Sequence, residues 1–186
     1  MAGTTRTHVA LLRAVNVGGR SIRIADLRAL IETLGFDDVS SLLQTGNFVF
    51  RAASRSPASI EQTLSTAIEG TFGLPTAVFV RSAGEWEALV RANPFPNAAR
   101  DDPGHLVLMC LEKAPGASAV DATEQAIAGS ETLAVIGRQA YIVYPDGIGP
   151  STFTGGLIER KLGTKGTARN WNTVLKIQQL FDARDR

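Results

Sequence analysis

The sequence of 186 residues contains few of the residues that form covalent or metal-bound frameworks: one cysteine, Cys110, and two histidines, His8 and His105. A single thiol excludes a disulfide within the chain, and a low cysteine content is typical of a reducing compartment. The sequence has no paired-cysteine motif and no His-Glu-x-x-His motif, so we expect no dedicated metal site. Cys110 lies in an apolar run and is expected to be a core residue.

A long hydrophobic run is also missing. Near the start of the chain, Arg13 interrupts the apolar stretch after only a few residues, which is too short for the hydrophobic region of a signal peptide. No segment approaches the roughly 20 apolar residues that cross a bilayer as a helix. We therefore expect a cytoplasmic protein with no membrane partner.

The chain has no strong net charge and few aromatic residues. The formal net charge is +1 and aromatic residues make up 6% of the sequence, whereas nucleic-acid-binding modules usually combine a basic face with aromatic side chains that stack on bases. The charge is nevertheless uneven, because residues 1–35 hold five arginines and residues 151–176 hold five lysines and arginines. These two segments form an anion-attracting patch if they meet in the fold, and are ordinary solvated charges if they do not.

The residues that are present predict a globular α+β protein. Hydrophobic residues make up 44% of the chain and charged residues 20%, as in ordinary domains with a core. In the first half, period-2 and period-3.6 patterns predict strands and helices in alternation. The predicted elements are a strand at 7–15, a helix at 24–34, β-type runs at 40–44 and 47–52, a helix at 57–71, a strand at 76–82 and a helix at 84–92.

A break separates this half from a second half with a similar pattern. Residues 93–104 contain three prolines among Asn and Asp residues, a composition typical of a boundary. The predicted elements that follow are a strand at 105–113, a helix at 120–129, β-type runs at 131–137 and 138–147, a helix near 157–163, a basic loop at 162–170 and a last helix at 170–183. We predict two packed ferredoxin-like (βαββαβ) halves, residues 1–95 and 104–186, joined by a loop at 96–103, with an added C-terminal helix.

No set of catalytic residues is evident. The Gly-x-Ser-x-Gly motif of a nucleophile elbow is absent. His8 and His105 lie at the edges of predicted strands without a catalytic partner at an informative spacing, so we expect structural or partly exposed histidines. The sequence therefore identifies no reaction, and it leaves open whether the protein is an enzyme and whether it uses a cofactor.

Two glycine-containing loops follow predicted strands and precede helices. The loop VNVGGR, residues 15–20, can direct backbone amides at an anion, with Arg20 and Arg23 nearby. The second loop, PDGIGPSTFTGG at 145–156, begins like a phosphate-binding loop, but Pro150 removes an amide donor and Thr152 replaces the third glycine. A plain turn is the preferred interpretation of the second loop.

The stretch GTARNWNTV, residues 166–174, surrounds one tryptophan with polar residues. Thr167 or Asn170 is suited to cap the last helix, and Trp171 is expected to face the core. Arg169 and Asn172 add more polar groups than capping requires. Two interpretations stay open: a ligand-binding surface, or a structural helix start.

Five motifs together resemble one bacterial family: LLRAVNVGG, LQTGNFVF, YPDGIG, LIERKLG and TARNWNTVLK, in this order and over nearly the whole chain. By these motifs the chain resembles the domain of unknown function 1697 family. The resemblance implies a small cytoplasmic α+β protein with two related halves, and it implies no activity. The sequence departs from the family's pattern at Ala14, where relatives have glycine, and at residues 150–152, where relatives are rich in basic residues.

We expect a small anionic ligand, either a nucleotide or a phosphorylated metabolite, at a polar cleft. This prediction requires the first strand and its loop to lie beside the start of the last helix. The alternatives are a nucleic-acid-binding module and a structural or interaction protein without a small ligand. The predicted ligand-binding residues are Arg13, Asn16, Gly18, Gly19, Gln44, Asn47, Arg169, Asn170 and Asn172.

Overall fold

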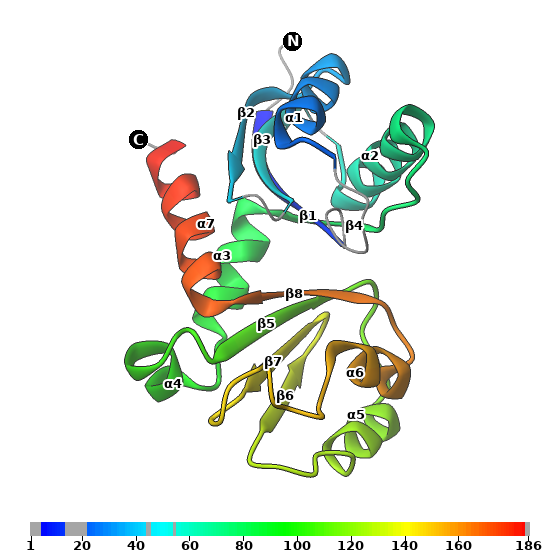
Figure 1. Ribbon diagram of the computed structural model, residues 1–186. Helices are drawn as coiled ribbons and strands as arrows, with labels where there is room; N and C mark the ends of the chain where they lie inside the picture. The colour runs from blue at the N-terminus through cyan, green and yellow to red at the C-terminus, as the bar shows by residue number, and fades with distance from the viewer. Residues whose placement is uncertain (1–4, 14–21, 44–45, 54, 185–186) are drawn as a thin grey trace. The chain divides into compact units, whose positions relative to one another are not determined.

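The computed structural model describes residues 5–13, 22–43, 46–53 and 55–184 of the chain. These residues form two compact units (Figure 1). Unit 1 comprises Met1–Glu87 and Lys176–Arg186, and unit 2 comprises Ala88–Leu175. The chain therefore passes from unit 1 to unit 2 within the helix α3 (Ala83–Arg91) and returns within the last helix, α7 (Trp171–Arg184).

Unit 1 is built on a four-stranded antiparallel sheet with the strand order β2-β3-β1-β4. Two helices, α1 and α2, connect strands in the βαββαβ order of a ferredoxin-like unit. The elements are β1 (Thr5–Leu12), α1 (Ile24–Thr33), β2 (Asp37–Leu42), β3 (Asn47–Ala53), α2 (Pro57–Phe72) and β4 (Val78–Ser82).

The core of unit 1 lies between the sheet and its two helices. Alternate residues of β1, among them Ala10 and Leu12, pack with Leu27 of α1 and Leu64 of α2, because successive side chains of a strand point to opposite faces. The other face of β1 is buried as well, since Val9 and Leu11 are 0% and 1% exposed. A strand buried on both faces explains why residues 7–15 appear in the sequence as an apolar run.

Unit 2 repeats this arrangement with a second antiparallel sheet, of strand order β6-β7-β5-β8. Val107 and Met109 of β5 pack with Ile158 and Leu162 in its core. The elements are α4 (Pro96–Asp101), β5 (Leu106–Leu111), α5 (Ala117–Glu124), β6 (Thr132–Ile136), β7 (Gln139–Val143), α6 (Gly155–Leu162) and β8 (Gly166–Asn170).

The helices α2 and α6, which occupy the same place in the two units, begin and end in the same way. Ser56 and Thr154 are their N-caps, and each side chain accepts a backbone N–H from the third residue that follows. Gly73 and Gly163 end them with φ of 64° and 65°, values that favour glycine because it has no Cβ. The predicted duplicated ferredoxin-like fold is thus confirmed, and the likeness of the two units includes the caps of α2 and α6.

Two segments differ from the elements predicted for them. Residues 166–170, predicted as part of a loop, form the strand β8 because they pair with β5 from Gly166 opposite Leu111 to Asn170 opposite Val107. The segment 96–103, predicted as a connecting loop, contains the short helix α4, whose first residue is Pro96. Proline is well tolerated at a first helical position, where its missing N–H would have no acceptor within the helix.

Within the described ranges, none of the helices has both the length and the apolar character that a membrane span requires.

Candidate functional site

Four of the nine predicted ligand-binding residues fall outside the described residues: Asn16, Gly18, Gly19 and Gln44. The glycine-containing loop at 15–20 falls outside them too. The remaining five lie partly in unit 1 and partly in unit 2. The single ligand face predicted from the sequence therefore stays a prediction.

The two described members in unit 1 lie at the ends of neighbouring strands. Arg13 follows β1, is half-buried, and donates its backbone N–H to the carbonyl of Ala77, 2.9 Å away. Asn47 begins β3 and is fully buried, with its Nδ2 donating to the carbonyl of Leu42 at 3.0 Å. This bond joins the end of β2 to the start of β3, so Asn47 has a structural role in the β2–β3 connection.

The three members in unit 2 surround the junction of β8 and α7. The side-chain oxygen of Asn170 accepts hydrogen bonds from the backbone N–H and from the hydroxyl of Thr173, both at 3.0 Å. Asn170 therefore caps α7, which is the role given to it in the structural interpretation of this segment. Trp171 is buried and its ring lies 6.4 Å from that of Tyr141. Asn172 is exposed.

Arg169 is part of the strand β8 and points to the sheet face opposite the core helices. Its Nη1 donates to the Thr167 hydroxyl at 2.9 Å and to the Ala168 carbonyl at 2.8 Å. Desolvation by burial lowers the pKa of the guanidinium to about 10. The side chain therefore remains cationic at neutral pH, and its polar partners hold it in one orientation.

A hollow with a more distinctly cationic lining lies in unit 1, at the end of the sheet where β1 begins. We call it the arginine hollow; it has a volume of about 490 Å³. Arg6 of β1 and Arg51 of β3 are among its lining residues, and none of its described lining residues is acidic. Arg51 shares a sheet face with Thr7, whereas Arg6 lies opposite Ala52 on the other face. The lining residues are Thr5, Arg6, Thr7, Arg51, Ser82, Ala83 and Gly84.

The register of the sheet brings these residues together. Thr7 lies opposite Arg51 on β3, and His8 lies opposite Ser82 on β4. The Nη2 of Arg51 donates to the carbonyl of Arg184 at 2.9 Å, which restrains the guanidinium. Ser82 ends β4 immediately before α3, so the first turn of α3 also lines the hollow.

A second hollow, of about 410 Å³, shares Arg6 and Ser82 with the first. Arg55 lines it and lies over the Phe36 ring at 5.5 Å, a cation–π contact. Glu85 lines it too, but its Oε2 accepts both the backbone N–H of Ser82 at 2.8 Å and the Ser82 hydroxyl at 3.0 Å. With the Glu85 N–H donating back to the Ser82 hydroxyl, the two residues form a capping box at the start of α3.

His8 closes the inner side of this second hollow. It is 1% exposed, and its Nδ1 lies 3.0 Å from the carbonyl of Arg6. Burial lowers the pKa of the imidazole, which favours the neutral form with Nδ1–H donating to that carbonyl. A structural histidine was expected here.

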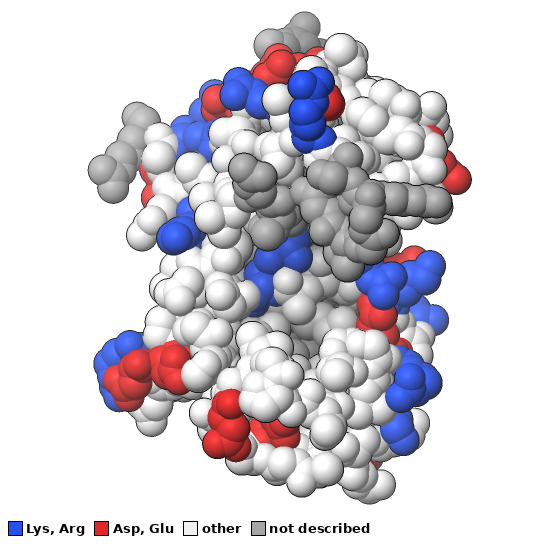
Figure 2. All heavy atoms as spheres, viewed as in Figure 1, with Lys and Arg blue, Asp and Glu red and all other residues white. Residues whose placement is uncertain are grey.

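Three of the five basic residues in segment 151–176, namely Arg160, Lys161 and Lys165, lie in α6 or just after it. On the face shown in Figure 2, Lys and Arg side chains gather over the α6 region of unit 2. A hollow of about 440 Å³ there is lined by Lys113, Arg160 and Lys165, but also by Glu112 and Glu159. Because two glutamates share this lining, the hollow is less suited to an anionic ligand than the arginine hollow.

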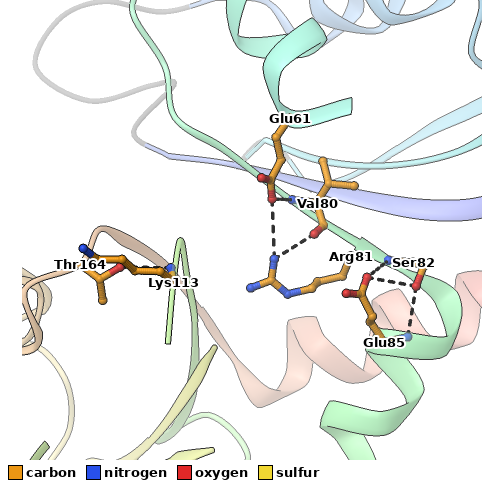
Figure 3. A network of polar contacts seen from close by, with 7 residues as sticks. All are labelled: Glu61, Val80, Arg81, Ser82, Glu85, Lys113 and Thr164. Atoms are coloured by element: carbon orange, nitrogen blue, oxygen red, sulfur yellow. Dashed lines mark hydrogen bonds and ion pairs between the residues drawn. The ribbon is translucent and has the colours of Figure 1, made fainter. Parts of the chain in front are cut away.

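Sequence reasoning also missed a buried ion pair in unit 1 (Figure 3). Arg81 of β4 has a side chain only 1% exposed, and its Nη1 lies 2.8 Å from the carbonyl of Val80 and 3.7 Å from the Oε1 of Glu61. The same Oε1 accepts the backbone N–H of Val80 at 2.8 Å. Glu61 of α2 thus forms an ion pair with Arg81 and accepts a backbone N–H of the edge strand β4.

His105 in unit 2 has a partner that the sequence analysis did not identify. Its Nδ1 lies 2.7 Å from the Oδ2 of Asp102, and both side chains are exposed. The spacing of three residues was visible in the sequence, but Asp102 also matched the pattern of a turn residue. Within the described residues, no three His, Cys, Asp or Glu side chains gather as metal ligands would.

Comparisons with known proteins place the chain in a family. A solved structure of a conserved bacterial protein from Streptococcus pneumoniae is similar to it, with a TM-score of 0.75 and 21% identity, over 96% of this chain and 99% of that chain. At this identity the likeness shows a shared fold. Comparison with curated proteins finds no match. Residues 5–141 match the family described as protein of unknown function DUF1697, the family that the sequence motifs resemble, and the chain therefore belongs to it.

Proposed function

We propose that this protein binds a small anionic ligand, a phosphorylated metabolite or a nucleotide, in the arginine hollow of unit 1. The observation that carries the proposal is the lining: two arginines, Arg6 and Arg51, and no acidic residue among the described lining residues. The volume of about 490 Å³ lies within the range of small-molecule sites.

The other lining groups are also suited to phosphate oxygens. Thr5 and Thr7 contribute hydroxyls that can donate hydrogen bonds. Ala83 and Gly84 belong to the first turn of α3, where backbone N–H groups have no acceptor within the helix. Guanidinium groups bind phosphate with two parallel N–H bonds, and these charge-assisted bonds are stronger than neutral ones.

The restraint on Arg51 supports binding by a preformed site. Because the Arg184 carbonyl already accepts from Arg51 Nη2, less side-chain freedom is lost when a ligand binds. The adjoining hollow with Arg55 leaves room for a ligand larger than phosphate itself.

This proposal keeps the predicted chemistry and assigns it to other residues. The face predicted from the sequence, with Arg169 and Asn172 among its members, is a separate hypothesis and needs its own variant. Arg169→Gln serves this purpose, because it removes the charge at β8 and leaves the arginine hollow unchanged.

The test is binding of inorganic phosphate, adenosine monophosphate and a sugar phosphate, measured by calorimetry and by the shift of the melting temperature. A ligand that binds only the native state raises that temperature. We expect Arg6→Gln and Arg51→Gln each to weaken binding by about tenfold or more, as expected for a lost charge-assisted bond. Arg28→Gln is the matched control, because Arg28 is an exposed arginine of the same unit that pairs with Glu32.

Three results would contradict the proposal. They are an absence of binding by all three phosphates, equal binding by the Arg6, Arg51 and Arg28 variants, and loss of binding in Arg169→Gln alone. The last result would instead support the face predicted from the sequence.

A further inference from the structure

Both sheets have edge strands, and two of these edges are covered by a glutamate from a neighbouring helix. At β4, Glu61 of α2 accepts the N–H of Val80 at 2.8 Å (Figure 3). At β8, Glu159 of α6 accepts the N–H of Gly166 at 2.7 Å. Exposed edges offer unpaired backbone groups to other chains, and these bonds occupy such groups.

The edge at β2 is blocked in another way. The β2–β3 register shifts between Asp37 and Ser40, and Asp38 has a positive φ of 49°. Arg184 of α7 donates to the Asp38 carboxylate, the Asp38 carbonyl and the Ser40 hydroxyl at 2.7–2.9 Å. An irregular strand bonded to an arginine is a poor template for pairing.

The remaining edge strand, β6, has neither device. It ends in the two-residue turn Gly137-Arg138, so Ile136 and Gln139 form the first hydrogen-bonded pair of the hairpin. By alternation, the backbone N–H and C=O of Leu133 and Val135 are directed away from β7. Among the described residues, no side chain or loop forms a hydrogen bond to these outward groups.

The composition of β6 does not protect it either. The strand Thr132–Ile136 contains no charged residue and no proline, the residues that commonly prevent edge pairing. Ile136 is 42% exposed, which makes it one of the large apolar side chains most open to solvent in the described part of the chain.

We propose that β6 pairs antiparallel with β6 of a second copy of this chain, about a twofold axis at Ala134. In this register Leu133 of one copy lies opposite Val135 of the other, so the outward groups of both residues bond in pairs. Ile136 then lies opposite Thr132 of the second copy and is partly covered. The two four-stranded sheets of unit 2 become one continuous sheet.

The charges at the two ends of β6 favour a second copy as the occupant. Glu131 precedes the strand, and Asp146 lies beside it, bonded to Ser130. Arg138 follows the strand. An antiparallel twofold arrangement brings the basic end of each copy to the acidic end of the other, and such an interface is self-complementary.

The test is sedimentation of the purified full chain from micromolar to millimolar concentration, with the Ala134→Lys and Ala134→Glu variants. Ala134 is half-buried and neutral, and either charge meets its own copy across the axis. We expect the parent to dimerise as its concentration rises. For each variant we expect a dimer dissociation constant at least about tenfold higher than that of the parent. An equimolar mixture of the two variants should dimerise again, because opposite charges then meet.

The matched control is Ser41→Lys, which adds the same charge to an exposed position of the blocked edge strand β2. It should dimerise like the parent. The proposal is overturned by a parent protein that stays monomeric throughout, by Ala134 variants that dimerise as strongly as the parent, or by a mixture that stays as weak as its components. Recovery in the mixture also shows that the variants are folded. The outcome is independent of ligand binding, because the arginine hollow belongs to unit 1.

Discussion

Arg81 and Arg169 occupy the same position in the two halves of the fold. Arg81 is the second-to-last residue of β4 and lies opposite Val9, and Arg169 is the second-to-last residue of β8 and lies opposite Leu108. Val9 and Leu108 are both buried. In both, Nη1 donates to the carbonyl of the preceding residue at 2.8 Å. Both therefore have the same local geometry at their strand ends.

The likeness continues into the next residue. Ser82 follows Arg81 and caps α3, while Asn170 follows Arg169 and caps α7. The duplication thus includes an arginine, a capping side chain and a helix start, in addition to the order of strands and helices. The arginines differ in their acidic neighbours, since Glu61 lies near Arg81 whereas Thr167 accepts from Arg169.

The caps lead to a first prediction. Asn170→Ala removes the acceptor for the Thr173 N–H, and Ser82→Ala removes the acceptor for the Glu85 N–H. Each change should lower the free energy of unfolding by about 1 kcal/mol. Urea titration followed by circular dichroism measures the loss. Asn170→Asp keeps an acceptor oxygen and should stay near the parent; a loss as large as that of the alanine variant would contradict the capping role.

A second prediction concerns the buried pair of Arg81 and Glu61. Glu61→Ala removes the carboxylate beside a guanidinium that is 1% exposed and also the acceptor for the Val80 N–H. We expect a loss of about 2 kcal/mol, reduced from the cost of breaking a fully buried pair because Glu61 is partly exposed. Glu61→Gln keeps an acceptor and should lose less.

The control for this prediction is Glu32→Ala, which breaks the exposed pair with Arg28. Exposed pairs contribute little, so the expected loss is below about 0.5 kcal/mol. Urea titration measures both losses. Equal losses of unfolding free energy for Glu61→Ala and Glu32→Ala would show that the buried pair stabilises the fold no more than the exposed pair.

The third prediction contrasts two glycines near each other in the sequence. A Cβ added at Gly166 of β8 would lie 2.7 Å from the Cε of Met109 and 3.1 Å from the carbonyl oxygen of Cys110. Gly166→Ala should therefore lower the free energy of unfolding by about 1–3 kcal/mol through overpacking. Gly156 of α6 has no atom within 4 Å of an added Cβ, so Gly156→Ala should raise it by about 0.5–1 kcal/mol. Thermal or urea unfolding measures both changes. A stabilised Gly166→Ala variant together with a destabilised Gly156→Ala variant would contradict the prediction.

The fourth prediction concerns the pH dependence of stability. Burial lowers the pKa of His8 below its ordinary value of 6.5. Below that value the unfolded chain takes up a proton that the folded chain resists, so the stability present at higher pH is lost as the pH falls. His8→Gln should flatten this loss between about pH 7.5 and pH 5.5, by up to about 1.4 kcal/mol per pH unit. A parent and variant with parallel profiles in urea titrations would contradict it.

The order of strands and helices follows from the sequence to a large extent. Apolar residues at period 2 and period 3.6 predicted the βαββαβ order of the first half. These signals are local, because burial of one face acts on residues a few positions apart. The sequence offered Thr167 and Asn170 as caps of the last helix for the same reason, and Asn170 is the one that accepts the Thr173 N–H.

The strand β8 was not predicted, because its residues are Gly, Thr, Ala, Arg and Asn, most of which have little intrinsic preference for strands. Pairing with the fully buried β5 overrides this preference. As a result Arg169 lies on a strand and directs its guanidinium to one sheet face, where the sequence predicted a loop.

The sequence by itself determined the order of strands and helices in the first half and the buried position of Trp171, because both depend on neighbours within one or two turns. Only the tertiary structure decided which cations share a hollow. Arg6 and Arg51 are far apart in the sequence and line the same hollow because β1 and β3 pair with Thr7, the neighbour of Arg6, opposite Arg51. Register is set by the packing of whole strands against a core, so no local pattern around either arginine could reveal the other.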